Sequence, residues 1–566
     1  MGKVLEFKQT AASLLSAGTT FFDRECYGDA IDCFYRAHLK DTKNERIMCS
    51  LGEAYLAIND PMQAASWYLR ALNEDDGVED VYTGLVRCYG DMGYDMREAA
   101  YYYFAMGKNH GIVTPDEIEY IGDLEDDYDA DGDGRQSRAD SVNDTVKFQR
   151  AQAFMRENAL SAAYILFGSV SGSDSHYADA RRMMMKIDYE RGRYSDAAEL
   201  ADELLAENDC DTQALIYGAA SYDRLGVHDK RDAYYERAEI DKDTSCDDME
   251  TLAQVAWYMS RYDDAIKIYR SIKNFLPYDR DILMQLAMCY ANVGDKDSAK
   301  SYIIDVCRLY PDDLALKYYA DRIDGLDGKA DFEPLDTVPE SEAIRREDEL
   351  DDFMVKHGSV SAATQAFKKS PEMTEYLEWL FQEGDRGLQM SIGGFLAQGK
   401  RWRPFCERQL ISPYVNEQVK KKILLGMFDC DPVEVGVTTS QLYRKIKYDP
   451  PEELWPFSLE VYSYTFVCLL FFGDGYLADL DDVYKQLNHK LFEMRCASPS
   501  WDIPALAAAI CYRCNLTREK LSKSDCLEIF DCDRDKFEEY IDCELFDDVK
   551  KLRKSTRAKS KRRELR

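Results

Sequence analysis

Residues 129–140, DADGDGRQSRAD, have the residue types and part of the spacing of a calcium-binding loop. Aspartates stand at positions one, three and five of this twelve-residue stretch, and Gly134 stands at position six, where such a loop turns sharply. Position twelve is Asp140 instead of the longer glutamate that binds calcium through both oxygens, and the flanks do not predict a pair of helices. The stretch therefore predicts an acidic insertion, and calcium binding stays open as a hypothesis.

The other residues that could do chemistry form no complete motif. Cys511 and Cys514 lie close together in the apolar run ALAAAICYRC, but zinc needs four ligands, so buried structural thiols are favoured. The glycines of GGFLAQGK, residues 393–400, lack the full spacing and the terminal Ser/Thr of a phosphate-binding loop. The six histidines form no ligand or nucleophile pattern, and no convincing strand is predicted. We therefore expect no enzyme, no cofactor and no metal site.

The charge of the chain bears on its partners. A net charge of −34 argues against general binding to nucleic acid or to an anionic membrane. The last 17 residues are the exception, with ten Lys and Arg against one Glu. They predict a basic disordered tail over residues 549–566, which could bind nucleic acid, anionic lipid or an acidic protein.

The sequence also indicates a compartment. Its first residues lack the basic region and continuous apolar stretch of a secretion signal. The longest apolar run, VCLLFF, is too short to span a bilayer and predicts a buried core helix. Seventeen cysteines without framework spacing suit a reducing cytosol. We expect a cytoplasmic, bacterial protein that does not contact a membrane.

Much of the chain repeats one pattern of residues at a fixed period. An alanine recurs, in most units with an aromatic residue four positions later and a small residue twelve positions before it. Ala201 and Ile303 replace the aromatic in two units, and Arg87 and Met185 replace the small residue in two. The spacing between successive alanines is 34, 35 and 64 residues, and then 34 four times in succession, with an arginine filling one slot. The positions are Ala30, Ala64, Ala99, Ala163, Ala197, Arg231, Ala265 and Ala299. A fixed period of this length predicts stacked helix hairpins, which we number as repeats 1 to 8.

The pattern resembles the tetratricopeptide repeat (TPR) over about residues 11–323. The resemblance implies an all-α, right-handed superhelical solenoid, followed here by a second helical domain. In such a solenoid the small residues let paired helices approach closely and the aromatic fills the space between hairpins. The stretch LKYYADRI, Leu316–Ile323, predicts part of a final capping helix.

Breaks in the period predict the domain organisation. We expect a three-repeat array, an acidic flexible insertion, a five-repeat array with its cap, a linker rich in glycine, proline and acids, a helical C-terminal domain and the basic tail. The predicted ranges are 1–113, 114–143, 144–323, 324–341, 342–548 and 549–566. Whether the two arrays stack into one superhelix stays open.

The resemblance also implies where a partner binds. TPR partners usually lie in the groove lined by the first helix of each repeat, at repeat positions two, five, nine and twelve. On the second array these positions include aromatic, methionine and arginine residues, which are types enriched at binding hot spots. Each could equally pack against a neighbouring helix. The partner-binding candidates are Arg182, Lys186, Tyr189, Trp257, Met284 and Met288.

The end of the C-terminal domain is weakly similar to the last part of a cyclin-like or helix–turn–helix domain. Ser524–Phe530 would be its first helix and Arg534–Ile541 its second. The second helix carries three acids against two basic residues, so a packing role is favoured over DNA reading.

The function that we expect is a non-catalytic scaffold or adaptor that binds a partner protein or peptide. The alternative is a nucleic-acid-associated regulator that uses the C-terminal domain and the basic tail. The identity of the partner and the oligomeric state do not follow from the sequence.

Overall fold

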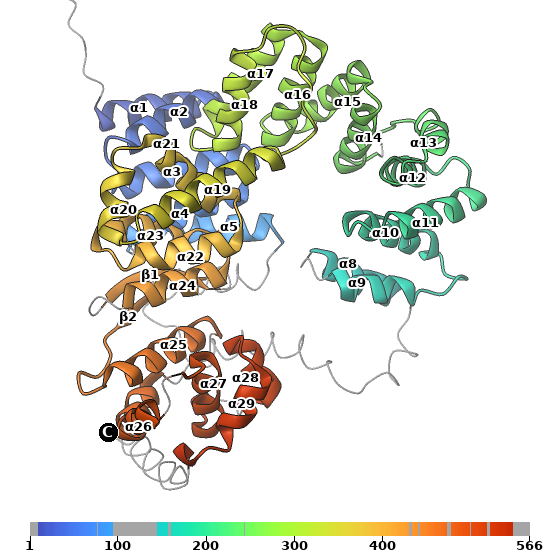
Figure 1. Cartoon of the computed structure of the whole chain (residues 1–566). Coiled ribbons are helices and arrows are strands. Elements are labelled where there is room, and N and C mark those ends of the chain that lie inside the picture. The colour runs from blue at the N-terminus through green and yellow to red at the C-terminus, as the bar shows by residue number, and fades with distance from the viewer. Residues whose placement is uncertain are drawn as a thin grey trace, which may run out of the picture. The chain divides into compact units, whose positions relative to one another are not determined.

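The computed structural model divides the chain into two domains, Met1–Glu340 and Ser341–Arg566 (Figure 1). The sequence predicts that the C-terminal domain begins at residue 342. The structure describes residues 10–75, 77–93, 144–156, 160–242, 244–428, 433–439, 442–472, 477–497, 500–517 and 521–546.

The first domain is an all-α solenoid of helix hairpins, which confirms the predicted fold class. The described helices of its first array are α1 (Ala11–Phe22), α2 (Tyr27–His38), α3 (Glu45–Ala57), α4 (Pro61–Glu74) and α5 (Glu79–Asp91). Its second array consists of α8 (Asp144–Arg156), α9 (Leu160–Gly168), α10 (Tyr177–Glu190), α11 (Tyr194–Glu207), α12 (Thr212–Arg224), α13 (His228–Tyr235), α14 (Cys246–Tyr258), α15 (Tyr262–Phe275), α16 (Arg280–Val293), α17 (Lys296–Leu309) and α18 (Leu314–Asp324). Helix α18 is the capping helix that LKYYADRI predicted.

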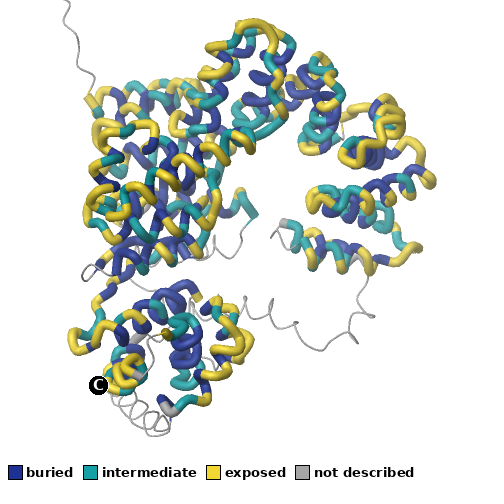
Figure 2. Tube along the Cα trace, in the orientation of Figure 1, coloured by how far each residue is buried: buried dark blue, intermediate teal, exposed yellow. Residues whose placement is uncertain are grey.

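The repeat pattern builds this solenoid by close packing between small and aromatic residues. The repeat alanines and the aromatics four positions later are buried wherever their side chains are described, along the facing sides of the paired helices (Figure 2). Gly52 of α3 and Gly84 of α5 lie against the ring of Tyr68 on α4, so a Cβ atom at Gly52 would lie 2.7 Å from that ring. Gly18 of α1 lies against the ring of Phe34 in the same way, so in repeats 1 and 2 the small residue twelve positions before the alanine makes room for the aromatic that follows it.

The two arrays contact each other through α2 and α17. The Tyr55 hydroxyl donates to the carbonyl oxygen of Leu309 at 2.7 Å, and the Tyr310 hydroxyl donates to Asp60 Oδ2 at 2.9 Å. The rings of Tyr27 and Tyr278 meet edge to face with centroids 5.7 Å apart. The beginning of the first array is therefore packed against the end of the second array.

The second domain is mostly helical. Its helices are α19 (Glu340–Lys356), α20 (Val360–Phe367), α21 (Pro371–Glu383), α22 (Arg386–Ala397), η2 (Lys400–Trp402), α23 (Arg403–Ile411), α24 (Glu417–Phe428), α25 (Pro456–Phe472), α26 (Leu477–Ala497), α27 (Ile503–Cys514), α28 (Lys523–Phe530), α29 (Arg534–Ile541) and η3 (Glu544–Phe546). Helix α25 contains VCLLFF and is largely buried, which confirms the predicted core helix. Within the described residues no helix is long and apolar enough to cross a membrane.

A β-hairpin in this domain corrects the expectation that strands are absent. Strand β1 (Val433–Thr439) pairs antiparallel with β2 (Leu442–Tyr448), with Val433 opposite Tyr448 and Thr439 opposite Leu442. The β-branched residues of VEVGVTT favour a strand, but the run is short and lies between strongly helical patterns. All but one residue of β1 are buried, so packing inside the domain selects this conformation.

The glycines that superficially suggested a phosphate loop have a packing role. Gly393 and Gly394 lie on α22, and Gly426 lies on α24. A Cβ atom at Gly426 would lie 2.3 Å from the carbonyl oxygen of Gly394, so only glycine permits this approach of the two helices.

Candidate functional site

Three of the six predicted binding residues lie on α10 and connect repeats. Arg182 forms an ion pair with Asp211, the N-cap residue of α12, at 2.7 Å. Lys186 Nζ lies 2.7 Å from a carboxylate oxygen of Asp248 in the first turn of α14. Tyr189 packs its ring against Tyr194 and Tyr217. The two basic side chains thus join repeat 5 to repeats 6 and 7.

The Asp248 carboxylate is the centre of this connection. Burial opposes its ionisation, but hydrogen bonds from Lys186 and Gln213 outweigh burial and lower its pKa. Its side chain is only 1% exposed, so the ion pair is shielded from solvent.

The other three predicted residues lie on the first helices of repeats 7 and 8. Trp257 of α14 is 3% exposed, and Met284 and Met288 of α16 are fully buried. Of the three, Trp257 donates a hydrogen bond to a segment that follows the solenoid in the sequence.

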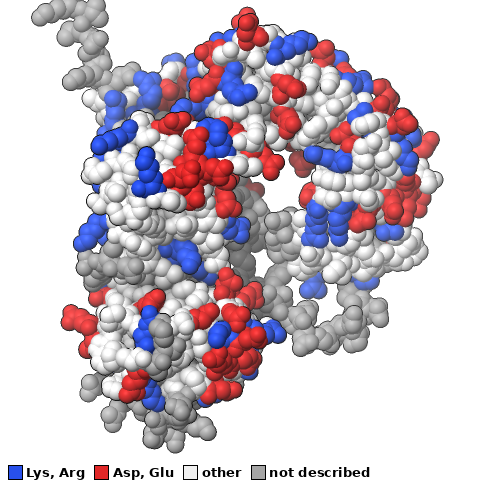
Figure 3. Space-filling model, in the orientation of Figure 1, with Lys and Arg blue, Asp and Glu red and all other residues white. Residues whose placement is uncertain are grey.

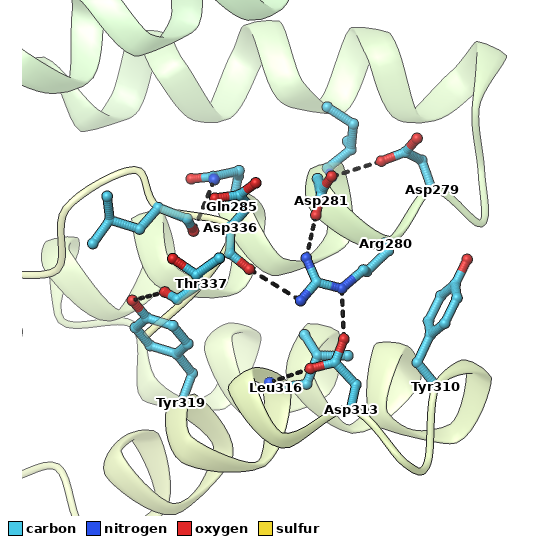
Figure 4. Close-up of polar contacts among 12 residues, drawn as sticks. Asp279, Arg280, Asp281, Gln285, Tyr310, Asp313, Leu316, Tyr319, Asp336 and Thr337 are labelled. Carbon is cyan, nitrogen blue, oxygen red and sulfur yellow. Dashed lines mark hydrogen bonds and ion pairs between the residues drawn. The ribbon is translucent and has the colours of Figure 1, made fainter. Parts of the chain in front are cut away.

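That segment, residues 326–338, is named here the inner segment. It lies against a surface formed by the first helices of repeats 7 and 8 and by the capping helix. We call this surface the binding face, and it consists of Trp257 of α14, Arg280, Gln285 and Asn292 of α16, and Tyr319 of α18. Phe332 pairs with Asn292 near the C-terminal end of α16, and Asp336 pairs with Arg280 at its N-terminal end. Figure 4 shows the contacts at the Arg280 end.

Asn292 holds one residue of the inner segment through both of its polar atoms. Its Nδ2 donates to the carbonyl oxygen of Phe332 at 2.8 Å, and its Oδ1 accepts from the Phe332 amide at 2.8 Å. Trp257 Nε1 donates to the same carbonyl oxygen at 2.9 Å. One residue of main chain is therefore completely paired by two side chains that are nearly closed to solvent.

The other side chains of the binding face also bond to main-chain carbonyl oxygens of the inner segment. Gln285 Nε2 donates to the carbonyl oxygen of Leu335 at 3.2 Å, and the Tyr319 hydroxyl donates to that of Thr337 at 3.1 Å. Tyr319 also meets the ring of Phe332 edge to face, with centroids 5.4 Å apart. A face that pairs with main-chain groups and receives one aromatic ring can hold extended segments of many sequences.

Arg280 supports the other end of the inner segment. Its Nη2 donates to the carbonyl oxygen of Asp336 at 3.0 Å, and its Nε lies 2.6 Å from Asp313 Oδ2. A further ion pair joins it to Asp281, and Figure 4 shows the guanidinium between these partners. These carboxylates raise the pKa of Arg280 against the opposing effect of burial, so its charge is fixed.

The surroundings of this end are acidic. Burial, followed by the charges of Asp281, Asp279 and Asp247, raises the pKa of Glu250 on α14 to about 7. Burial is also the main cause that raises the pKa of Asp281, and the nearby charge of Asp336 adds to it. The inner segment thus brings a carboxylate to a place that already disfavours negative charge.

Arg280, Gln285, Asn292 and Tyr319 were not among the predicted site residues. The sequence contained one signal for two of them, because Gln285 and Asn292 are amides within the otherwise apolar run ILMQLAMCYANV. A buried amide needs a hydrogen-bond partner, and here both amides find it in the inner segment. The run 324–341 predicted a linker, and its composition gave no sign of this attachment.

Other predicted features fall elsewhere. The possible calcium loop at 129–140 and the basic tail at 549–566 lie outside the described residues. In the described part of the chain, no group of three or more His, Cys, Asp or Glu is arranged to hold a metal. The two helices predicted near the C-terminus are present as α28 and α29, and α29 buries Phe537, Tyr540 and Ile541.

Comparison with known proteins supports the repeat assignment. Residues 281–313, which span almost all of α16 and α17, match the tetratricopeptide repeat family. A search of curated protein sequences gave no match.

Solved structures of TPR proteins are also similar to parts of the chain. A thermophilic TPR protein of Thermus thermophilus is 16% identical over 32% of this chain and 100% of its own, with a TM-score of 0.27. A TPR protein from Parabacteroides merdae is 12% identical over 49% of this chain and 98% of its own, with a TM-score of 0.24. The MamA protein is 15% identical over 30% and 92%, with a TM-score of 0.25. Similarity at this level carries no function across.

Proposed function

We propose that this chain, in which residues 281–313 match the tetratricopeptide repeat family, is a protein-interaction scaffold whose binding face holds an extended segment of a partner protein. The observation that carries the proposal is the pairing of Asn292 and Trp257 with the main chain of Phe332. Such pairing recognises a peptide as an extended chain, whatever most of its side chains are.

The proposed surface extends beyond the binding face toward repeat 5. Arg182, Lys186 and Tyr189 lie on α10, the first helix of that repeat, and are partly exposed. In this proposal they contact a longer partner, whereas Met284 and Met288 support the binding face from within α16. Recognition by these side chains, without catalysis, is the proposed mode of action, and the cytoplasm is the proposed compartment.

The alternative, a nucleic-acid-associated regulator, gains no support from α29. This helix buries Phe537, Tyr540 and Ile541, and it exposes Glu538 and Glu539. Carboxylates repel a phosphate backbone, so this helix favours a packing role.

Binding of a synthetic peptide tests the proposed function. The chain is made at full length with residues 326–338 replaced by Gly and Ser, which leaves the binding face vacant. A fluorescent peptide with the sequence of residues 326–338 is then titrated by anisotropy. We expect saturable binding with a Kd of about 1 to 100 μM, because a short flexible peptide loses conformational entropy when it binds.

A matched pair of variants identifies the surface. Asn292→Ala removes two hydrogen bonds to the peptide and should weaken binding by about tenfold. Asn274→Ala on α15 changes an exposed asparagine outside the binding face and should leave the Kd unchanged. Absence of peptide binding, or equal effects of the two substitutions, would overturn the proposed function.

A further inference from the structure

The inner segment fits the binding face incompletely at Gln285. This side chain is 2% exposed, and its Oε1 accepts no hydrogen bond from the described residues. Leu335, whose carbonyl oxygen pairs with Gln285, uses its own amide to donate to the carbonyl oxygen of Glu333 at 2.8 Å, and the preceding Pro334 has no amide hydrogen. A buried acceptor without a partner is unfavourable, so a segment with a free amide hydrogen here would bind better.

The inner segment is also mismatched in charge. Its sequence, LDGKADFEPLDTV, contains four acids and one lysine. Asp336 is exposed, is close enough to Asp281 to raise the pKa of that carboxyl, and forms no ion pair with a described residue. Asp279 and Asp247 also help to raise the pKa of Glu250, so carboxylates are concentrated near the start of α16, where Arg280 is already ion-paired with Asp281 and Asp313. Figure 3 shows the acidic and basic side chains on one face of the molecule.

Some parts of the inner segment fit the binding face well. The main chain of Phe332 is completely paired, and its ring lies against Tyr319. Exposure alternates around this residue, since Asp331 and Glu333 point to solvent whereas Ala330, Phe332 and Pro334 are partly buried. Alternation of this kind is typical of an extended chain with one side against a surface.

From these features we propose that the binding face takes, in place of the inner segment, an extended partner segment with an aromatic residue at the position of Phe332, no proline at that of Pro334, and Lys or Arg at that of Asp336. The inner segment is then an internal competitor that this partner displaces. The proposal rests on the proposed function and adds the chemistry of the partner and the means of regulation.

The internal competitor sets a threshold for the partner. A segment tied to its own binding face by a short linker acts at an effective concentration on the order of millimolar. The affinity of an external segment is reduced by the fraction of molecules whose binding face is vacant. Complementary charge and a paired Gln285 are the differences by which an external segment overcomes this disadvantage.

Peptide variants test the proposal on the full-length chain with residues 326–338 replaced by Gly and Ser. At 50 mM NaCl the Asp336→Lys peptide should bind about fivefold tighter than the native peptide, and this advantage should shrink at 500 mM NaCl because salt screens the charges. The Pro334→Ala peptide should bind about twofold to fivefold tighter because its new amide can pair with Gln285. The Phe332→Ala peptide should bind about tenfold weaker.

The control for charge is the Asp331→Lys peptide, which has the same net charge as Asp336→Lys but places the lysine at a position that faces solvent. A lysine attracted only by the overall negative charge of the chain would improve both peptides equally. An advantage of Asp336→Lys over Asp331→Lys is the expected result. Equal gains, or no gain, would overturn this inference while leaving the proposed function intact if the native peptide binds and Asn292→Ala weakens it.

Competition is measured with the wild-type chain and with Phe332→Ala in the otherwise native chain. Wild type should bind the Asp336→Lys peptide about tenfold or more weakly than the chain with the replaced segment. Phe332→Ala loosens the inner segment without altering the binding face, so it should recover much of that loss. If all three chains bind the peptide with the same Kd, the inner segment is not a competitor and this part of the inference is wrong.

Discussion

The side chain of Asn292 allows the binding face to pair with the main chain of a bound segment. An asparagine amide has the same donor and acceptor arrangement as a peptide group, so it can pair with the amide and carbonyl of one residue at once. In a helix that is largely apolar and buried, this amide is satisfied by the main chain of Phe332. Removing it would leave both main-chain groups of Phe332 without this partner.

Glu250 gives a prediction about pH at the same scale. Its pKa of about 7 in the folded chain lies above the value of about 4.3 in an unfolded chain. The folded state therefore binds an additional proton between these values, and the stability that this carboxyl contributes is lost as the pH rises from about 4 through 7. Glu250→Gln should raise the free energy of unfolding by about 1 to 2 kcal/mol at pH 8 and change it little at pH 4.

Urea denaturation at the two pH values checks this prediction. The charged groups that face Glu250 are Asp247 on its own helix and Asp279 and Asp281 at the start of α16. A substitution that stabilises the chain equally at both pH values would contradict this account, because titration of Glu250 would not be the cause.

The six partner-binding residues that the sequence indicates stay predictions. Position in the repeat identified Trp257, which contacts the inner segment, and also Met284 and Met288, which are fully buried. Periodicity assigns a residue to one side of a helix, but it does not say whether another part of the chain covers that side. The inner segment follows the last helix of the solenoid and lies outside the repeats. The repeat pattern alone therefore could not predict that this segment packs against α16.

At the scale of the helix, the solenoid depends on glycines that face aromatic rings. Gly52→Ala would improve helix propensity by up to about 1 kcal/mol, but the added Cβ would lie 2.7 Å from the buried ring of Tyr68. Overpacking of this kind costs about 1 to 3 kcal/mol, so we expect a net loss of stability.

Gly28→Ala on α2 is the matched control. Its nearest neighbour, a methyl group of Leu309, would lie 3.7 Å from the new Cβ, which is an ordinary contact. Thermal unfolding should show a lower Tm for Gly52→Ala and an equal or higher Tm for Gly28→Ala. A lower Tm for both would mean that the glycines matter for another reason.

The sequence predicted the helix hairpins of the first domain but not the β-hairpin of the second. The helix hairpins followed from the 34-residue period, because each repeat has to bury the same pattern of small and aromatic residues. The hairpin of β1 and β2 was missed because its seven-residue strands have no repeat and depend on packing inside the second domain. Local pattern is a weak guide wherever tertiary contacts select the conformation.

At the scale of the first domain, the contact between the two arrays should contribute to the free energy of unfolding. Burial, and then the nearby charge of Asp60, raises the pKa of Tyr310, so its hydroxyl stays protonated and donates to that carboxylate. Tyr310→Phe removes this bond and should lower the free energy of unfolding by about 1 to 2 kcal/mol.

Tyr278→Phe at the same contact tests whether the hydroxyl matters. Tyr278 meets Tyr27 edge to face through its ring, which phenylalanine retains. It should change the stability by less than about 0.5 kcal/mol in the same denaturation experiment. Equal losses for the two substitutions would contradict the role assigned to the Tyr310 hydroxyl.

Hydrogen exchange of the Phe332 amide in the intact chain tests the central claim most directly. If Asn292 Oδ1 accepts from this amide as the structure has it, exchange at Phe332 should be at least about 100-fold slower than in an unstructured peptide. Asn292→Ala, or an excess of the Asp336→Lys peptide, should remove that protection. A Phe332 amide that exchanges at the unstructured rate in the wild-type chain would contradict the account.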